Sequence, residues 1–189
     1  MKSVKMAAMA AVIALMSTPA AAEVTAFTFG VIDMGQVMAQ SEAAKDVYAQ
    51  MERKRTEYQA ALAKEEESLR AEEQELMKSK DKLSREELEK KRLAFETRVA
   101  KWQKTHVDRR RTLDRALGLS IDKLRAEAAK NVASIAKEKN YSAVLTQDAV
   151  MISRPELDMT GEVIARLNKS IKKLPIDWSA AGADPSKKK

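Results

Sequence analysis

Few residues in this 189-residue chain could carry out acid–base, nucleophilic or metal chemistry. His106 is the single histidine and cysteine is absent, so neither a zinc site nor a thiolate nucleophile can be built from the usual residues. We interpret His106 as one side chain on a long helix, because a catalytic histidine normally has a second polar partner. The sequence therefore predicts no catalytic residue and no metal site.

The carboxylates and glycines fit no catalytic arrangement either. Acidic residues come in runs at positions 65–67 and 72–73, which is typical of a solvated helix face. The five glycines are isolated, so no Gly-rich loop is present to bind a phosphate. We predict that the protein is not an enzyme and uses no cofactor.

The N-terminus has the three parts of a secretory signal peptide. Lys2 and Lys5 precede an apolar run at 6–16, and small residues at 20–22 form a cleavage pattern. The run is too short for a membrane anchor, which needs about 20 apolar residues. Removal of residues 1–22 lowers the net charge from +7 to +5, because two lysines and no acid are lost. We expect an exported protein that does not bind nucleic acid.

Residues 36–117 contain neither glycine nor proline and are rich in helix-forming residues, which predicts a long helical segment. The apolar seam of its first part is Val47, Met51, Tyr58, Leu62, Leu69 and Leu76. A sealed two-stranded coiled coil has apolar residues at both heptad core positions. In this segment apolar residues occupy about half of the heptad core positions, so the helix is only weakly amphipathic.

The helical segment is expected to fold back on itself near residues 78–84. Ser41 fits a helix N-cap, and Ser84 with Glu87 fits a capping box that starts a second helix at Arg85. One continuous helix is the alternative, since no glycine or proline marks the break. With the turn, residues 41–135 form a helical-hairpin arm.

Gly118 lies within the returning helix, where the seam spacing becomes irregular around Leu113, Leu117 and Ile121. Two interpretations stay open. Gly118 is either a packing glycine where another backbone comes close, or a hinge at which the arm bends.

Charge placement also suggests a hairpin. Residues 65–75 hold six acids and one base, and folding at the tip would place them beside Lys90, Lys91, Arg92 and Arg98. The tip itself is basic, and its candidate anionic lipid contacts are Lys78, Lys80, Lys82 and Arg85. A simple solvated turn is the alternative to lipid contact.

Short β-like runs flank the arm. Residues 27–32 read as a strand, and 141–145 with 149–152 read as a hairpin. Asn140 can adopt the left-handed cap of the long helix. The candidate core or oligomerisation residues are Phe27, Phe29, Val31, Val144, Leu145, Val150 and Ile152.

These patterns predict an α+β fold that is mostly α: a long antiparallel helical-hairpin (coiled-coil) arm on a small β-containing oligomerisation body. The body comprises residues 23–40 and 136–174, and residues 175–189 form a disordered tail. Because so few strands bury little surface and leave open edges, we expect obligate oligomerisation.

The chain resembles the Skp (OmpH-like) periplasmic chaperones. The resemblance rests on residues 30–38, 41–45, 140–145 and 157–160 in this order around the charged hairpin. Family members commonly have Gly-Tyr where this chain has Asn140 and a tyrosine, a change compatible with a left-handed cap.

The resemblance implies a homotrimer whose arms surround a cavity. That cavity would hold unfolded outer-membrane β-barrel proteins without ATP and prevent their aggregation. The family has also been linked to lipopolysaccharide and anionic lipid. The candidate client contacts on the arm are Met51, Tyr58, Met77, Phe95 and Trp102. The alternative function is a coiled-coil tether or adaptor of the envelope that binds a folded partner.

Overall fold

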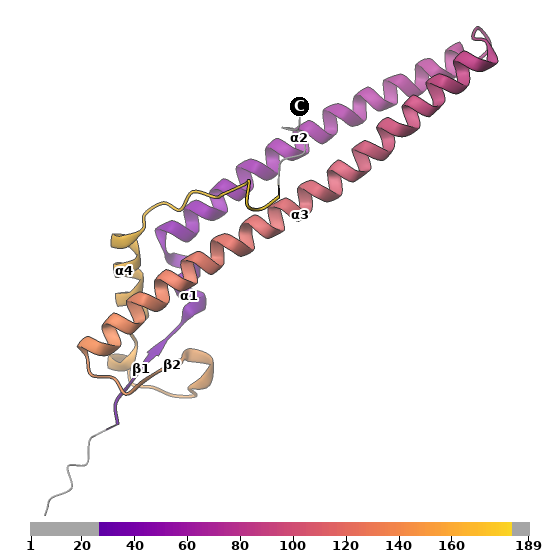
Figure 1. The fold of residues 1–189 in the computed structure, drawn as a ribbon. Coiled ribbons are helices and arrows are strands. Elements are labelled where there is room, and N and C mark those ends of the chain that lie inside the picture. The colour runs from indigo at the N-terminus through magenta and orange to yellow at the C-terminus, as the bar shows by residue number, and fades with distance from the viewer. Residues whose placement is uncertain (1–26, 183–189) are drawn as a thin grey trace, which may run out of the picture.

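The computed structural model describes residues 27–182. The signal peptide predicted for residues 1–22 lies outside the described residues, as do residues 183–189. The elements in order are β1 (Phe29–Ile32), α1 (Met34–Gln40), α2 (Glu42–Ser79), α3 (Arg85–Glu138), β2 (Ala143–Thr146), the 3₁₀ turns η1 (Gln147–Ala149) and η2 (Pro155–Leu157), and α4 (Thr160–Ser170). Figure 1 shows α2 and α3 as one long antiparallel hairpin that projects from a small body. The predicted fold class, α+β and mostly α, is confirmed.

The hairpin turns where its capping residues predict. The Ser41 hydroxyl accepts a hydrogen bond from the Ala44 amide at the start of α2. Ser84 and Glu87 cap each other reciprocally at the start of α3. The alternative of one continuous helix is therefore wrong. α3 has 54 residues and is about 80 Å long at 1.5 Å per residue.

The predicted strand is followed by a short helix that the sequence pattern does not predict. Asp33 caps α1 by accepting a hydrogen bond from the Gln36 amide at 2.8 Å. Val37 and Met38 are its buried residues. The segment is too short for a helical period to stand out, and it turns the chain from β1 into α2.

The two strands pair in parallel, with Phe29 opposite Ala143, so the whole α2–α3 hairpin acts as the crossover between them. The predicted β-hairpin over 141–152 is wrong. Residues 147–149 form a 3₁₀ turn, and Ile152 lies outside any strand and is 88% exposed. The Val150 amide donates to the Gln147 carbonyl at 3.1 Å, so it closes the 3₁₀ turn and does not pair back with β2.

The end of α3 sets the register of this pairing. Asn140 has φ of 53°, as its expected left-handed cap requires. The Asn140 and Tyr141 amides donate to the Lys137 and Ala136 carbonyls, the hydrogen-bond pair of a Schellman motif. The chain then runs directly along β1, and the Ser142 amide donates to the Thr28 carbonyl at 2.7 Å.

The core lies where the base of the hairpin meets α1 and α4. Val37, Val47, Leu124, Ile135, Val163 and Leu167 are all fully buried there. Among residues 27–182, no helix combines the length and the apolar character needed to cross a membrane.

The candidate core or oligomerisation residues of the body differ in how deeply they are buried within the single chain. Val31 is buried and Val144 packs against the core. Phe27 and Leu145 are 70% and 36% exposed, so the structure corrects their assignment to the chain's own core. Phe29 and Val150 are half-buried. A role of these residues in oligomerisation stays a prediction.

The expected disorder from residue 175 is wrong for residues 175–182. Ile176 and Ala181 are 8% and 2% exposed and belong to the same core cluster as α2 and α3. Figure 1 shows this segment (yellow) running from α4 along the hairpin. Its alternating apolar residues find a surface on the arm, which composition alone does not reveal.

Candidate functional site

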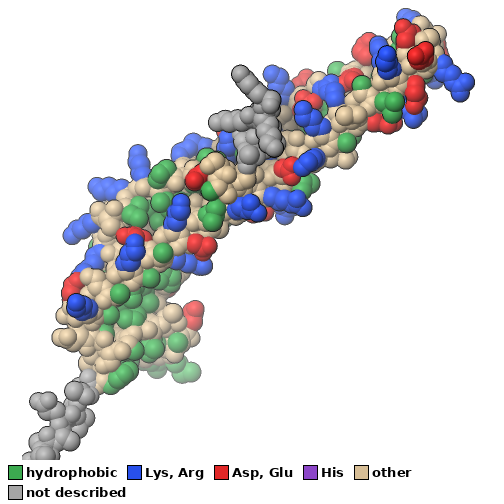
Figure 2. Space-filling view, viewed as in Figure 1, with side chains coloured by type: hydrophobic (Ala, Val, Ile, Leu, Met, Phe, Trp, Pro, Cys, Tyr) green, Lys and Arg blue, Asp and Glu red, His purple; other side chains and the backbone are tan. Residues whose placement is uncertain are grey.

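The outer half of the arm has almost no core of its own. From residue 59 round the tip to residue 108, a stretch described in full, Leu69 alone is buried. Figure 2 shows acidic and basic side chains over this outer half with scattered hydrophobic ones, whereas hydrophobic side chains gather toward the body. Because the apolar seam is sparse, the outer half of the single chain exposes charged side chains with scattered apolar ones among them.

The five candidate client contacts are not equally available. Met77 is 67% exposed, and Phe95 and Trp102 are half-buried. Met51 and Tyr58 are only 7% and 3% exposed, so the structure corrects their assignment as contact residues. Both lie on the α2 face that packs against α3 and the core.

Within residues 59–108, the periodic pattern missed two exposed apolar residues. Leu93 is 53% and Val107 is 49% exposed. The alternating four- and three-residue spacing of the returning helix passes through two polar residues, Arg92 and His106. Leu93 and Val107 directly follow them and so lie off that stripe. Apolar residues next to a polar seam position are the signal that would have found them.

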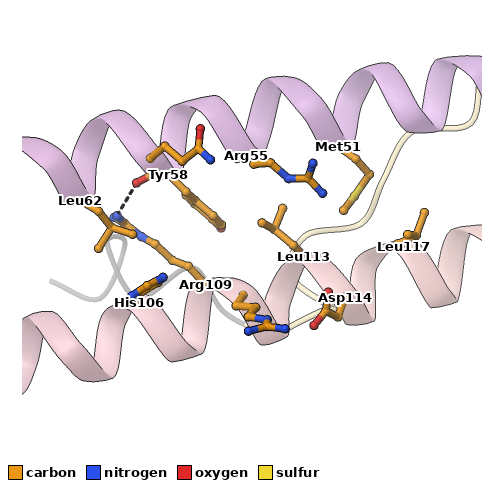
Figure 3. Close-up of a pocket in the computed structure, with 11 residues that line it drawn as sticks. Met51, Arg55, Tyr58, Leu62, His106, Arg109, Leu113, Asp114 and Leu117 are labelled. Carbon is orange, nitrogen blue, oxygen red and sulfur yellow. Dashed lines mark hydrogen bonds between the residues drawn. The ribbon is translucent and has the colours of Figure 1, made fainter.

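A groove with a volume of about 380 Å³ opens between α2 and α3 toward the body (Figure 3). Its lining residues are Met51, Arg55, Tyr58, Gln59, Leu62, His106, Arg109, Arg110, Leu113, Asp114 and Leu117. Three arginines and one aspartate make it basic. His106 is exposed and its ring lies 6.2 Å from that of Trp102, so it occupies the helix surface that the sequence predicts.

Arg109 lines this groove and spans it. Its side chain is 8% exposed, its Nη1 donates to the Tyr58 carbonyl at 3.3 Å, and its guanidinium carbon lies 4.9 Å from the Tyr58 ring centroid. Figure 3 shows it reaching across from α3 to α2. The aromatic face and the carbonyl stabilise this cation and tie the two helices together.

Farther out, one arginine joins the helices by ion pairs. Arg98 Nη2 lies 2.6 Å from Glu65, and Arg98 Nη1 also pairs with Glu72. The predicted neutralisation across the hairpin is therefore confirmed for Arg98. It is wrong for Arg92, which pairs with Glu89 and Glu96 on its own helix.

The basic tip is less uniform than its sequence suggests. Lys78 lies 3.3 Å from Glu75 on its own helix, whereas Lys80, Lys82 and Arg85 are exposed. A shallow hollow beside Arg85 also contains the acids Glu86 and Glu89. Lipid contact at the tip stays a prediction.

Gly118 lies on an exposed part of α3, which continues through it without a break. A Cβ added there would meet nothing within 4 Å. The interpretation as a packing glycine is therefore wrong within this chain, and the hinge stays a prediction. Over residues 27–182, no group of three or more His, Asp or Glu side chains is placed to hold a metal ion.

The family described as "Outer membrane protein (OmpH-like)" matches residues 28–167 of the chain. The chain belongs to the OmpH-like family. This match spans β1, the complete hairpin, β2 and most of α4, so it covers both the arm and the body.

A solved structure shares this fold. It is an OmpH-like protein from Caulobacter crescentus CB15 named as a candidate outer membrane chaperone, with a TM-score of 0.75 and 21% sequence identity. The alignment covers 80% of this chain and 89% of that one. No curated protein matches the chain.

Proposed function

We propose that the mature protein is an ATP-independent periplasmic holdase chaperone that binds unfolded outer-membrane β-barrel proteins between its arms. The observation that carries this proposal is an OmpH-like hairpin arm whose outer half has almost no sealed core. Scattered apolar side chains among charges suit weak contact with many clients. The long side chain of Met77 is adaptable and exposed.

Assembly into a homotrimer would create the cavity. Support comes from the exposed apolar side chains of the body, among them Phe27, Met151 and Ile152, at 70%, 98% and 88%. Over residues 27–182 the sheet has two strands. The outer side of β1 is already bridged to Asp158 at Val31, so the edge that could pair with a neighbouring subunit is the outer edge of β2. Sedimentation equilibrium of the mature protein tests this. Three chains per particle are expected, and a stable monomer would contradict the assembly.

The function is tested by diluting a urea-denatured outer-membrane β-barrel into buffer with and without the protein. Light scattering should fall in its presence, and equal scattering would rule out a holdase. Capture of one folded envelope protein without unfolded clients would favour a tether.

A matched pair of variants tests the arm surface. Met77→Ser, Leu93→Ser and Val107→Ser together remove three exposed apolar side chains, and should weaken client binding severalfold. Gln74→Ser and Gln103→Ser, both at exposed polar positions of the same helices, are the control. Equal binding by the two variants would show that clients bind elsewhere.

A further inference from the structure

The segment from Ile171 to Gly182, which we call the C-terminal strap, crosses the hairpin and lies beyond the residues matched by the family. After Asp177 the strap passes from α2 to α3, because the Asp177 carboxylate accepts hydrogen bonds from the Ser179 and Ala180 amides and forms a turn. Gly182, with φ of 115°, then lies against Thr112 of α3.

The first half of the strap is bound through its main chain. Gln50 Nε2 donates to the Leu174 carbonyl at 2.9 Å, and Gln50 Oε1 accepts from the Ile176 amide at 3.2 Å. Asp46 accepts from the Leu174 amide at 3.3 Å and from Gln50 at 2.8 Å, which orients the glutamine. Any extended polypeptide offers the same amides and carbonyls, so these contacts do not depend on the bound sequence.

The side chains of the strap alternate. Leu174, Ile176 and Trp178 are buried or half-buried and pack with the core cluster, whereas Pro175 and Asp177 between them are exposed. The Lys54 ammonium lies 5.8 Å from the Trp178 ring centroid. Alternation of apolar and polar residues in an extended chain is also the pattern of a transmembrane β-strand of an outer-membrane barrel.

We propose that the α2 surface around Asp46 and Gln50 is a docking site for extended client segments with alternating apolar residues, and that the strap occupies it as a built-in competitor. This inference rests on the proposed function. The apparent affinity for a client is the intrinsic affinity multiplied by the fraction of molecules in which the strap is undocked. A client strand binds by displacing the strap, which shields the same apolar surface when no client is present.

The test uses the full mature chain and a fluorescently labelled, urea-denatured β-barrel. Ile176→Glu places a charge on the buried side of the strap and leaves the α2 surface intact. Its client affinity should rise about tenfold, because the docked strap no longer competes. Ala180→Glu adds the same charge at an exposed strap position and should match the wild type. Trp178→Ala, a milder release of the strap, should lie between them.

A peptide with the sequence of residues 172–182 separates the two proposals. It should bind the Ile176→Glu chain and lower its client affinity, while the same peptide carrying Ile176→Glu should not. If the wild type fails to bind clients, the holdase proposal fails. Binding of the peptide to the Ile176→Glu chain still tests the docking site independently. Unchanged affinity in Ile176→Glu and Trp178→Ala, together with no peptide binding, would overturn the inference.

Discussion

Arg166 of α4 forms a two-pronged salt bridge with Glu138, the last residue of α3, with both nitrogen–oxygen distances at 2.6 Å. An acid at a helix C-terminus is disfavoured by the helix dipole, and the guanidinium offsets this. Arg166 also contacts Glu162, which pairs with Lys139. The cluster joins the last turn of the arm to the helix that covers the core.

This salt bridge predicts a pH-dependent stability. Hydrogen bonds from Arg166 and Ser134 lower the pKa of Glu138 from 4.5 to about 2. A carboxyl with a lowered folded-state pKa stabilises the fold above its unfolded-state pKa, and this contribution is lost as the pH falls through the folded-state value. Arg166→Met should therefore unfold at a lower temperature than the wild type at pH 7, and the difference should shrink between pH 4.5 and 2.

Thermal unfolding followed by circular dichroism at several pH values measures this effect. Arg154→Met is the control, because Arg154 is exposed and has no acid within 4.0 Å among residues 27–182. A stability difference for Arg166→Met that stays constant down to pH 2 would contradict the role of Glu138.

Gly30→Ala should destabilise the body. A Cβ at this position would lie 2.8 Å from the Tyr141 ring and 2.9 Å from the Met159 sulfur, so one of these side chains must move. Overpacking of this kind costs about 1–3 kcal/mol of unfolding free energy. Urea denaturation measures the loss, and a wild-type midpoint would show that Tyr141 moves freely.

Gly118→Ala should instead raise the free energy of unfolding. The added methyl group meets nothing, and alanine stabilises a helix interior by about 0.5–1 kcal/mol relative to glycine. If Gly118 is a hinge, the stiffer arm should also accept a narrower range of client sizes. Equal binding of small and large barrels by the variant and the wild type would refute the hinge while leaving the stability gain intact.

Arg98→Ala should loosen the outer arm, because Arg98 pairs across the hairpin with Glu65 and Glu72. Amide hydrogen exchange in residues 85–108 should become faster. Arg92→Ala is the matched control, since Arg92 pairs only with acids of its own helix among residues 27–182. Equal exchange in the two variants would show that the cross-hairpin pairs contribute nothing measurable, as holds for many surface ion pairs.

The sequence by itself determined the local boundaries of this protein. Ser41, Ser84 and Asn140 mark the start of α2, the start of α3 and the end of α3 as predicted. These features depend on hydrogen bonds within about five residues, so the chain carries the necessary information locally.

Only the tertiary structure decided which faces meet. Periodicity selected Met51 and Tyr58 as apolar arm residues, but not their burial between the helices. It could not show that Thr112, Ala116 and Ser120 are buried more deeply than the leucines beside them.

The parallel pairing of β1 with β2 and the docking of the strap on Gln50 join residues more than 100 positions apart. Such contacts depend on the whole chain closing around one core. A local pattern of side chains records the surface that each segment offers, and leaves open which segment will cover it.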